Sequence, residues 1–220
     1  MTRTIEPVLH NLREQLLRMG SCAEAILAKA LRAYFDGDEA LAGEVARDDL
    51  EIDRLDLEID DRVLKALALQ APVAADLRVI VAIKMIATDL ERVGDLARNI
   101  AKSALRRTRP SVAPAPAGLA QLAADVQRIL RHSLDAFSHG DAAAARAVLD
   151  DDDRIDSEEG EFIAGAIGAI PAHPERASEA VDSILIAKHL ERIADHATNI
   201  AEDVILVAEA RNVKHAAKLR

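Results

Sequence analysis

The sequence predicts an all-α protein made of two tandem three-helix bundles, with six long antiparallel helices related by an internal pseudo-twofold symmetry. Three observations support this fold class. First, 50% of the 220 residues are hydrophobic but only 2% are aromatic, and Gly and Pro are few, a composition with high helix propensity. Second, apolar residues recur at helical spacing over long stretches. Third, LERVGDLARNIA at 90–101 returns as LERIADHATNIA at 190–201, which indicates that the second half repeats the first.

Three helices are expected in the first half, each with one apolar face. The chain turns after the first helix at Gly37, which suits a left-handed C-terminal cap, and Asp36 or Asp38 can cap the helix that follows. The apolar stripe of the second helix is expected to include Leu67, and that of the third to include Leu77. The predicted helices cover about 5–35, 39–69 and 73–107.

The second half is expected to repeat this plan after a proline-rich linker at 109–118, which interrupts the helical pattern. Gly140 and Asp141 take the places of the first turn's glycine and aspartate. The predicted helices cover about 119–137, 142–170 and 175–211. The expected domains are therefore a first bundle at 1–108 and a second at 119–220.

Both copies of the repeated segment contain the pattern Glu-x-x-x-Asp-x-x-x-Asn. Side chains four residues apart stack along one face of a helix, so each copy places two carboxylates and an amide in a line. The amides can add carbonyl oxygens or hydrogen bonds around a bound cation. The two lines are Glu91, Asp95 and Asn99, and Glu191, Asp195 and Asn199.

The preceding helix of each half carries a second acidic pair at the same spacing. Carboxylates that converge raise one another's pKa unless a cation neutralises them, and oxygen ligands suit Mg²⁺, Ca²⁺, Mn²⁺ or iron. In either half alone, a solvated acidic face is the better interpretation. Recurrence of the same four positions in both halves favours a metal site in each. The candidate ligands are Asp49, Asp53, Glu91, Asp95, Asp152, Asp156, Glu191 and Asp195.

The basic residues near these lines have simpler interpretations. Arg92 and Arg192 follow the glutamates directly, and ion pairing between helices is their default role, ahead of contact with a partner or an anion. His189 and His196 have no histidine counterparts in the first half, which favours a surface or interface role over metal ligation.

Composition and missing motifs exclude several classes of protein. A formal net charge of −10 repels phosphate backbones, so no nucleic-acid partner is expected. The single Cys22 excludes an internal disulfide and a multi-cysteine zinc site. No signal peptide or membrane span is recognisable, which predicts a soluble cytoplasmic protein. No nucleophile motif is present, and the Glu-x-x-His of di-iron bundles is also missing, so no enzyme is expected.

The chain resembles the PhoU family of bacterial regulators of phosphate transport and phosphate signalling, over about residues 9–215. The two LER-x-x-D segments at 90–95 and 190–197 carry the resemblance. Further matching segments are 70–78, Asn99–Ala101, Asn199–Ala201, Asp49–Asp53, Asp152–Asp156 and the terminal Asn212–His215. One departure is Ala194, which stands where the first copy has Gly94, so helix packing is expected to differ there.

The resemblance implies a cytoplasmic, non-enzymatic adaptor. It would contact the ATPase of the phosphate importer and a sensor histidine kinase, and reach the membrane only through them. It would act as a negative regulator of phosphate uptake and of phosphate-starvation signalling. The resemblance also implies a homodimer, and metal clusters, multinuclear iron among them, on Glu91, Asp95, Glu191 and Asp195 with the four facing aspartates. Two alternatives stay open: a carboxylate-bridged di-metal enzyme, and a PhoU-like subunit of another ion transporter.

Overall fold

The structure is a computed structural model that describes residues 5–106 and 117–214. It is all-α, as predicted, with six long helices and no strand among the described residues. The helix ends all fall within two residues of the predicted ones. Helix α4 begins two residues early, inside the predicted linker, whose residues 109–116 lie outside the described chain. The helices are α1 Glu6–Asp36, α2 Glu39–Gln70, α3 Ala75–Arg106, α4 Ala117–His139, α5 Ala142–Ala169 and α6 Ala177–Glu209, with the short 3₁₀ helix η1 Pro174–Arg176 before α6.

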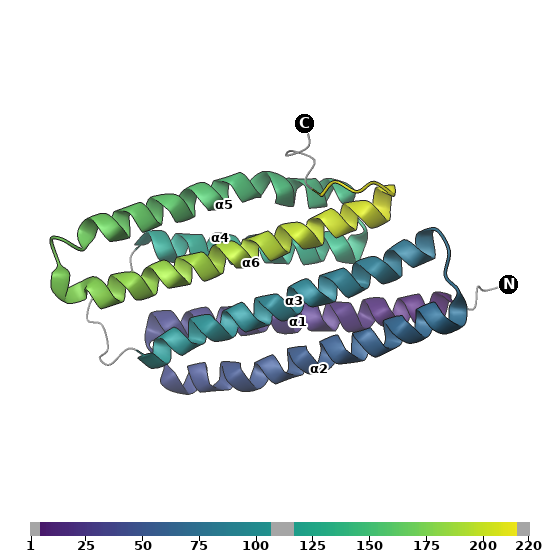
Figure 1. The fold of residues 1–220 in the computed structure, drawn as a ribbon, viewed down its shortest axis with the longest axis horizontal. Helices are drawn as coiled ribbons and strands as arrows, with labels where there is room; N and C mark the ends of the chain where they lie inside the picture. The colour runs from purple at the N-terminus through teal and green to yellow at the C-terminus, as the bar shows by residue number, and fades with distance from the viewer. Residues whose placement is uncertain (1–4, 107–116, 215–220) are drawn as a thin grey trace.

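The helices form two three-helix bundles that lie side by side. Helices α1, α2 and α3 pack against one another, and so do α4, α5 and α6. Helices α3 and α6 run antiparallel at the centre of Figure 1 and join the bundles, while α1 and α4 lie behind them. The α2–α3 and α5–α6 turns lie at opposite ends of the molecule (Figure 1). One broad face is therefore made by α2, α3, α6 and α5 in that order.

The first turn of each bundle has the cap chemistry that its sequence predicts. Gly37 and Gly140 have φ values of 68° and 63°, in the left-handed region that favours glycine. Asp38, rather than Asp36, caps α2 by accepting a hydrogen bond from the Leu41 amide at 2.9 Å. Asp141 caps α5 by accepting hydrogen bonds from two backbone amides. These caps fix the first residues of α2 and α5, and hence the positions of the acidic residues along both helices.

The core is aliphatic, and two residues predicted to belong to it do not. Leu67 and Leu77 are 36% and 40% exposed. On α2, the buried stripe continues from Val63 to Ala66 and leaves out Leu67. Successive residues turn by about 100° around a helix, so Leu67 lies beyond the edge of the face that the earlier core residues of α2 share. On α3, Leu77 lies five full turns before Asp95 and therefore on the same, partly exposed side of the helix.

Candidate functional site

The eight predicted carboxylates lie in two sets, one on the adjacent helices α2 and α3 and one on the adjacent helices α5 and α6. Within each set the charges act on one another. Asp49 interacts with Asp53 and Asp95. In the second bundle, Asp152 interacts with Asp156 and Asp195. The first set is Asp49, Asp53, Glu91 and Asp95, and the second is Asp152, Asp156, Glu191 and Asp195.

Burial is the main cause of pKa changes in both sets. It raises the pKa of Asp49 and Glu91 in the first set, where neighbouring arginines partly oppose it. In the second set, burial and then the neighbouring carboxylates raise the pKa of Asp152 to about 6. The pKa values of Glu191 and Asp195 rise for the same two reasons. Ionisation is therefore costly for Asp49 and Glu91 in the first set and for Asp152, Glu191 and Asp195 in the second.

Arg98 pairs with two carboxylates of the first set, a role that the sequence did not predict. One guanidinium nitrogen lies 2.6 Å from Asp49 Oδ2, and the other donates a hydrogen bond of 2.6 Å to Asp95 Oδ1. Asp49 is only 1% exposed. The guanidinium thus joins α2 to α3 through one carboxylate from each helix. The signal was visible in the sequence, because a basic residue three positions after Asp95 lies beside it on a helix.

Gly94 lets α2 approach α3 closely at this point. A Cβ atom at Gly94 would lie 3.0 Å from Asp49 Oδ1 and 3.0 Å from Ile52 Cδ1, tighter than ordinary van der Waals contact. The second bundle has Ala194 at this position, so its α5 and α6 cannot copy this contact.

Two further cations pair with carboxylates of α2 and α3, among them Asp56 and Asp60 of α2, which lie outside the first set. Lys84 Nζ lies 2.5 Å from Asp60 Oδ1 and 3.3 Å from Asp56 Oδ1. Arg92 lies 3.3 Å from Glu91 and 3.4 Å from Asp95, both on its own helix. The prediction that Arg92 pairs between helices is therefore wrong.

The second set has no equivalent of Arg98. Thr198 stands at that position, and its hydroxyl donates a hydrogen bond of 2.7 Å to the backbone carbonyl of Asp195. Asp152 Oδ1 is buried and has no hydrogen-bond partner in the described part of the chain. Glu159, which the sequence did not single out, is 5% exposed and pairs with Lys188 Nζ at 2.7 Å. The charges of His196, Arg192 and Lys188 lower the pKa of Asp195, against the larger effects of burial and Asp156.

His196 and Asn199 of α6 contact the other bundle. His196 Nδ1 lies 2.8 Å from Asp89 Oδ1 on α3, and Asn199 Nδ2 donates to the same oxygen at 3.3 Å. The predicted interface role of His196 is thereby confirmed. Asn99 instead accepts a hydrogen bond from Lys102 at 3.3 Å. Neither asparagine hydrogen-bonds to the carboxylates of the two sets in these contacts.

The fit of the two sets to a metal ion differs. Within residues 5–106 and 117–214, no three His, Cys, Asp or Glu side chains are grouped closely enough to hold an ion as they stand. In the first set, Arg98 takes the place between α2 and α3 that a cation would need. In the second set, Asp152 Oδ1 lacks a hydrogen-bond partner in the described chain, as Asp49 Oδ2 does in the first, and a hard cation would fit only if side chains closed around it.

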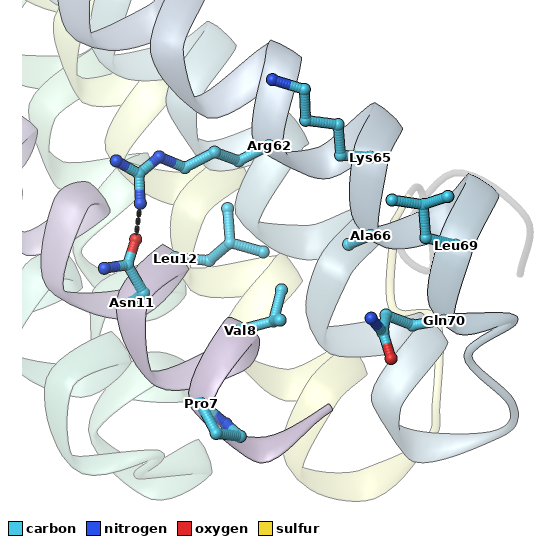
Figure 2. A pocket seen from close by; sticks show the side chains of 9 residues that line it. All are labelled: Pro7, Val8, Asn11, Leu12, Arg62, Lys65, Ala66, Leu69 and Gln70. Carbon is cyan, nitrogen blue, oxygen red and sulfur yellow. Dashed lines mark hydrogen bonds between the residues drawn. The ribbon is translucent and has the colours of Figure 1, made fainter. Parts of the chain in front are cut away.

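A separate cavity of about 380 Å³ lies at the end of the first bundle, between the start of α1 and the end of α2 (Figure 2). Its lining is mainly apolar, and Arg62 crosses it to donate a hydrogen bond to Asn11 Oδ1. No carboxylate is among the residues that line it, so it is distinct from both acidic sets. The lining residues are Pro7, Val8, Asn11, Leu12, Arg62, Lys65, Ala66, Leu69 and Gln70.

None of the helices in the described chain is both long and apolar enough to cross a membrane.

Comparison with known proteins identifies the family. The PhoU domain profile matches residues 16–104 and 119–204, one match for each bundle. The chain is 33% identical over 208 residues to the phosphate-specific transport system accessory protein PhoU homolog of Pseudomonas aeruginosa, covering 94% of this chain and 86% of that protein. It is 30% identical to the phosphate-specific transport system accessory protein PhoU of Serratia marcescens, covering 94% and 85%.

Solved structures agree with this assignment. The crystal structure of PhoU from Pseudomonas aeruginosa superposes with a TM-score of 0.91 at 32% identity, covering 94% of this chain and all of that one. The phosphate transport system regulatory protein PhoU from Streptococcus pneumoniae gives a TM-score of 0.86 at 28% identity, covering 94% and 97%. The chain, with its two matched bundles and its repeated LER-x-x-D segments, belongs to the PhoU family.

Proposed function

We propose that this chain is an accessory and regulatory protein of phosphate transport. It binds the ATPase of a phosphate importer and a sensor histidine kinase on the cytoplasmic side of the membrane. When phosphate is plentiful, it restrains uptake and keeps the phosphate-starvation genes repressed. The observation that carries the proposal is similarity over 94% of the chain to relatives named for the phosphate-specific transport system.

An adaptor is a better proposal than an enzyme, because the most conspicuous side chains form ion pairs and lack a nucleophile–base arrangement. Arg98, Lys84 and Lys188 each bind carboxylates across two helices. Such contacts orient helix surfaces for binding, whereas acid–base catalysis needs an accessible group poised beside a pocket.

Deletion of the gene in its host tests this proposal. We expect phosphate-starvation genes to become active at high phosphate, and a plasmid copy of the gene to repress them again. The tagged protein should also co-purify with the importer ATPase and with the kinase. Continued repression at high phosphate in the deletion strain, together with failure to recover either partner, would overturn the proposal.

We also propose that the chain binds a hard metal ion, Fe, Mn, Mg or Ca, through its acidic residues. The support is the cost of ionising Asp152, Glu191 and Asp195, together with the unpaired Asp152 Oδ1. A bound cation would neutralise these carboxylates and hold α5 against α6. Elemental content of protein purified without chelator should fall when Glu91, Asp95, Glu191 and Asp195 are all replaced by Ala, and equal content in both proteins would contradict metal binding.

A homodimer is the third part of the proposal, and a leucine stripe on α2 supports it. Leu50, Leu57 and Leu64 recur every seven residues and are 63–69% exposed. The fold does not require them, since the equivalent positions of α5 are Asp153, Gly160 and Ile167. Exposed apolar stripes at this spacing are typical of helix-pairing surfaces.

The internal symmetry of the stripe favours a second copy of this chain as its occupant. If two α2 helices pair antiparallel about Leu57, Leu50 meets Leu64 of the partner subunit, and the same contact forms twice by symmetry, so each leucine is covered by a leucine. Leu57→Lys should convert a dimer into a monomer in light scattering after gel filtration, while Leu185→Lys, an exposed leucine on α6, should not. A wild-type protein that is monomeric at micromolar concentration would overturn this assignment.

A further inference from the structure

The cavity at the end of the first bundle combines apolar walls with a basic edge. Two of its lining residues, Leu12 and Ala66, are 0% and 3% exposed, so the cavity reaches down to the apolar core. Arg62 and Lys65 are the only charged residues among those that line it. Its volume of about 380 Å³ lies in the range of small-molecule binding sites.

Arg62 carries a positive charge that no carboxylate neutralises in the described part of the chain. Its guanidinium donates a hydrogen bond to Asn11 Oδ1, a neutral acceptor on α1 (Figure 2). Glu58, one helical turn before Arg62, pairs with Arg54 instead. A guanidinium has five N–H donors, so Arg62 keeps donors for a bound group even while it holds Asn11. In a chain with a formal net charge of −10, such a cation beside an apolar cavity favours a negatively charged ligand.

Lys65 can interact with the same ligand. Its Nζ lies 2.5 Å from Asp61 Oδ2, but the two side chains are 65% and 60% exposed. An exposed ion pair of this kind contributes little free energy, so the ammonium group can be shared with an anion at the edge of the cavity. Asp61 stays close by, which favours a ligand with one negative charge over a more highly charged one.

The repeated fold does not require these features. When the first turns of the two bundles are aligned, Gly165 and Gly168 of α5 stand at the positions of Arg62 and Lys65. The α1 wall of the cavity belongs to residues 6–13, which precede the position where α4 begins in this alignment. The second bundle therefore packs without the two cations, which points to a role other than stability for them.

We propose that this cavity binds a free, single-chain amphiphilic anion, a carboxylate carried on an unbranched aliphatic chain. The aliphatic chain lies against Val8, Leu12 and Leu69, and the carboxylate reaches Arg62 and Lys65 at the edge. Burial of the chain provides most of the affinity, and the two cations select the charged head group. The inference goes beyond the proposed role in phosphate transport and does not depend on it.

Titration calorimetry of the full chain with decanoate tests the inference. Decanoate should bind at one site per chain, and octanoate should bind roughly tenfold more weakly, because two fewer methylenes are buried. Arg62→Gln with Lys65→Gln should weaken decanoate binding roughly tenfold but leave decanol binding unchanged, since the alcohol has no charge to lose. Arg146→Gln, which removes an exposed arginine paired with Glu209 outside the cavity, is the matched control and should bind decanoate as the wild type does.

A second pair of variants locates the aliphatic chain. Val8→Asp places a carboxylate in the apolar wall and should abolish binding of both decanoate and decanol. Leu57→Asp places the same charge on the exposed leucine stripe of α2, outside the cavity, and should leave both affinities unchanged. Circular dichroism and the unfolding midpoint, measured without ligand, establish that each variant is folded.

The outcomes separate this inference from its alternatives. Failure of the wild type to bind decanoate, or binding that survives both the Arg62/Lys65 and the Val8 substitutions, overturns the inference and leaves the proposed role in phosphate transport intact. Sedimentation of the wild type with phosphatidylglycerol vesicles, dependent on Arg62 and Lys65 and without decanoate binding, would also overturn it, because the two cations would then serve a membrane surface.

Discussion

Asp203 on α6 is a carboxylate without exposed surface, and its cationic partner lies beyond the end of its helix. Lys214 Nζ lies 3.0 Å from Asp203 Oδ1. Burial raises the pKa of Asp203 to about 6, against the partial opposition of Lys214. Because the pKa is higher in the folded state, Asp203 stabilises the fold most when protonated, and this contribution is lost as the pH rises from about 4 through about 6.

Lys214→Met is therefore expected to have a pH-dependent cost. At pH 8 the variant leaves a buried carboxylate unpaired, and the free energy of unfolding should fall by about 3 kcal/mol. At pH 5 the carboxyl is already protonated, and the loss should be much smaller. Urea denaturation at the two pH values measures the difference. In an Asp203→Asn background the same substitution should cost little at either pH, and an equal loss at pH 5 and pH 8 would contradict this account.

At the level of single residues, positions along one helix could be predicted from the sequence, whereas contacts between helices could not. The acidic sets follow from four-residue spacing, which holds on any helix, so Glu91 and Asp95 share a face as predicted. The Arg98–Asp49 contact could not be predicted in this way, because it depends on how α2 is rotated and shifted against α3. For the same reason the sequence did not show that Asp152 lacks the partner that Asp49 has.

At the scale of helices, the ends were predictable because their signals are local. Gly37, Gly140, Asp38 and Asp141 act on the few amides and carbonyls beside them. Burial along a helix was less predictable towards its ends. An apolar pattern read at fixed spacing drifts away from the true buried face by a few tens of degrees over several turns. Leu67 was misplaced for this reason.

The cap of α5 is expected to be stronger than that of α2. Asp141 accepts hydrogen bonds from the amides of Ala143 and Ala144, at 2.9 and 3.0 Å, whereas Asp38 accepts from one amide. Asp141→Ala should lower the free energy of unfolding by about 1 kcal/mol, and Asp38→Ala by less. Urea denaturation of both variants measures the order. Asp141→Asn keeps an accepting oxygen and should recover most of the loss, and a full loss in the Asn variant would contradict capping as the cause.

At the scale of the whole molecule, the two bundles meet along α3 and α6, and the polar part of this contact is not symmetric. His196 and Asn199 both reach Asp89 across the interface. The position equivalent to His196 in the first bundle is Leu96, which is buried. The sequence showed that the halves repeat, but not which helices meet, since every helix carries an apolar face suited to packing.

The His196–Asp89 contact is expected to couple the stabilities of the two bundles. If it links them energetically, the effects of His196→Ala and Asp89→Ala on the free energy of unfolding will not add. The double variant should lose about 1 kcal/mol less than the sum of the single variants, a coupling typical of residues in direct contact. The exposed Arg146–Glu209 pair within the second bundle serves as the control and should couple weakly, because solvent screens it. Additive losses for His196 and Asp89 would mean that apolar packing alone holds α3 against α6. The coupled result would instead mean that a specific polar contact, in addition to apolar packing, holds α3 against α6.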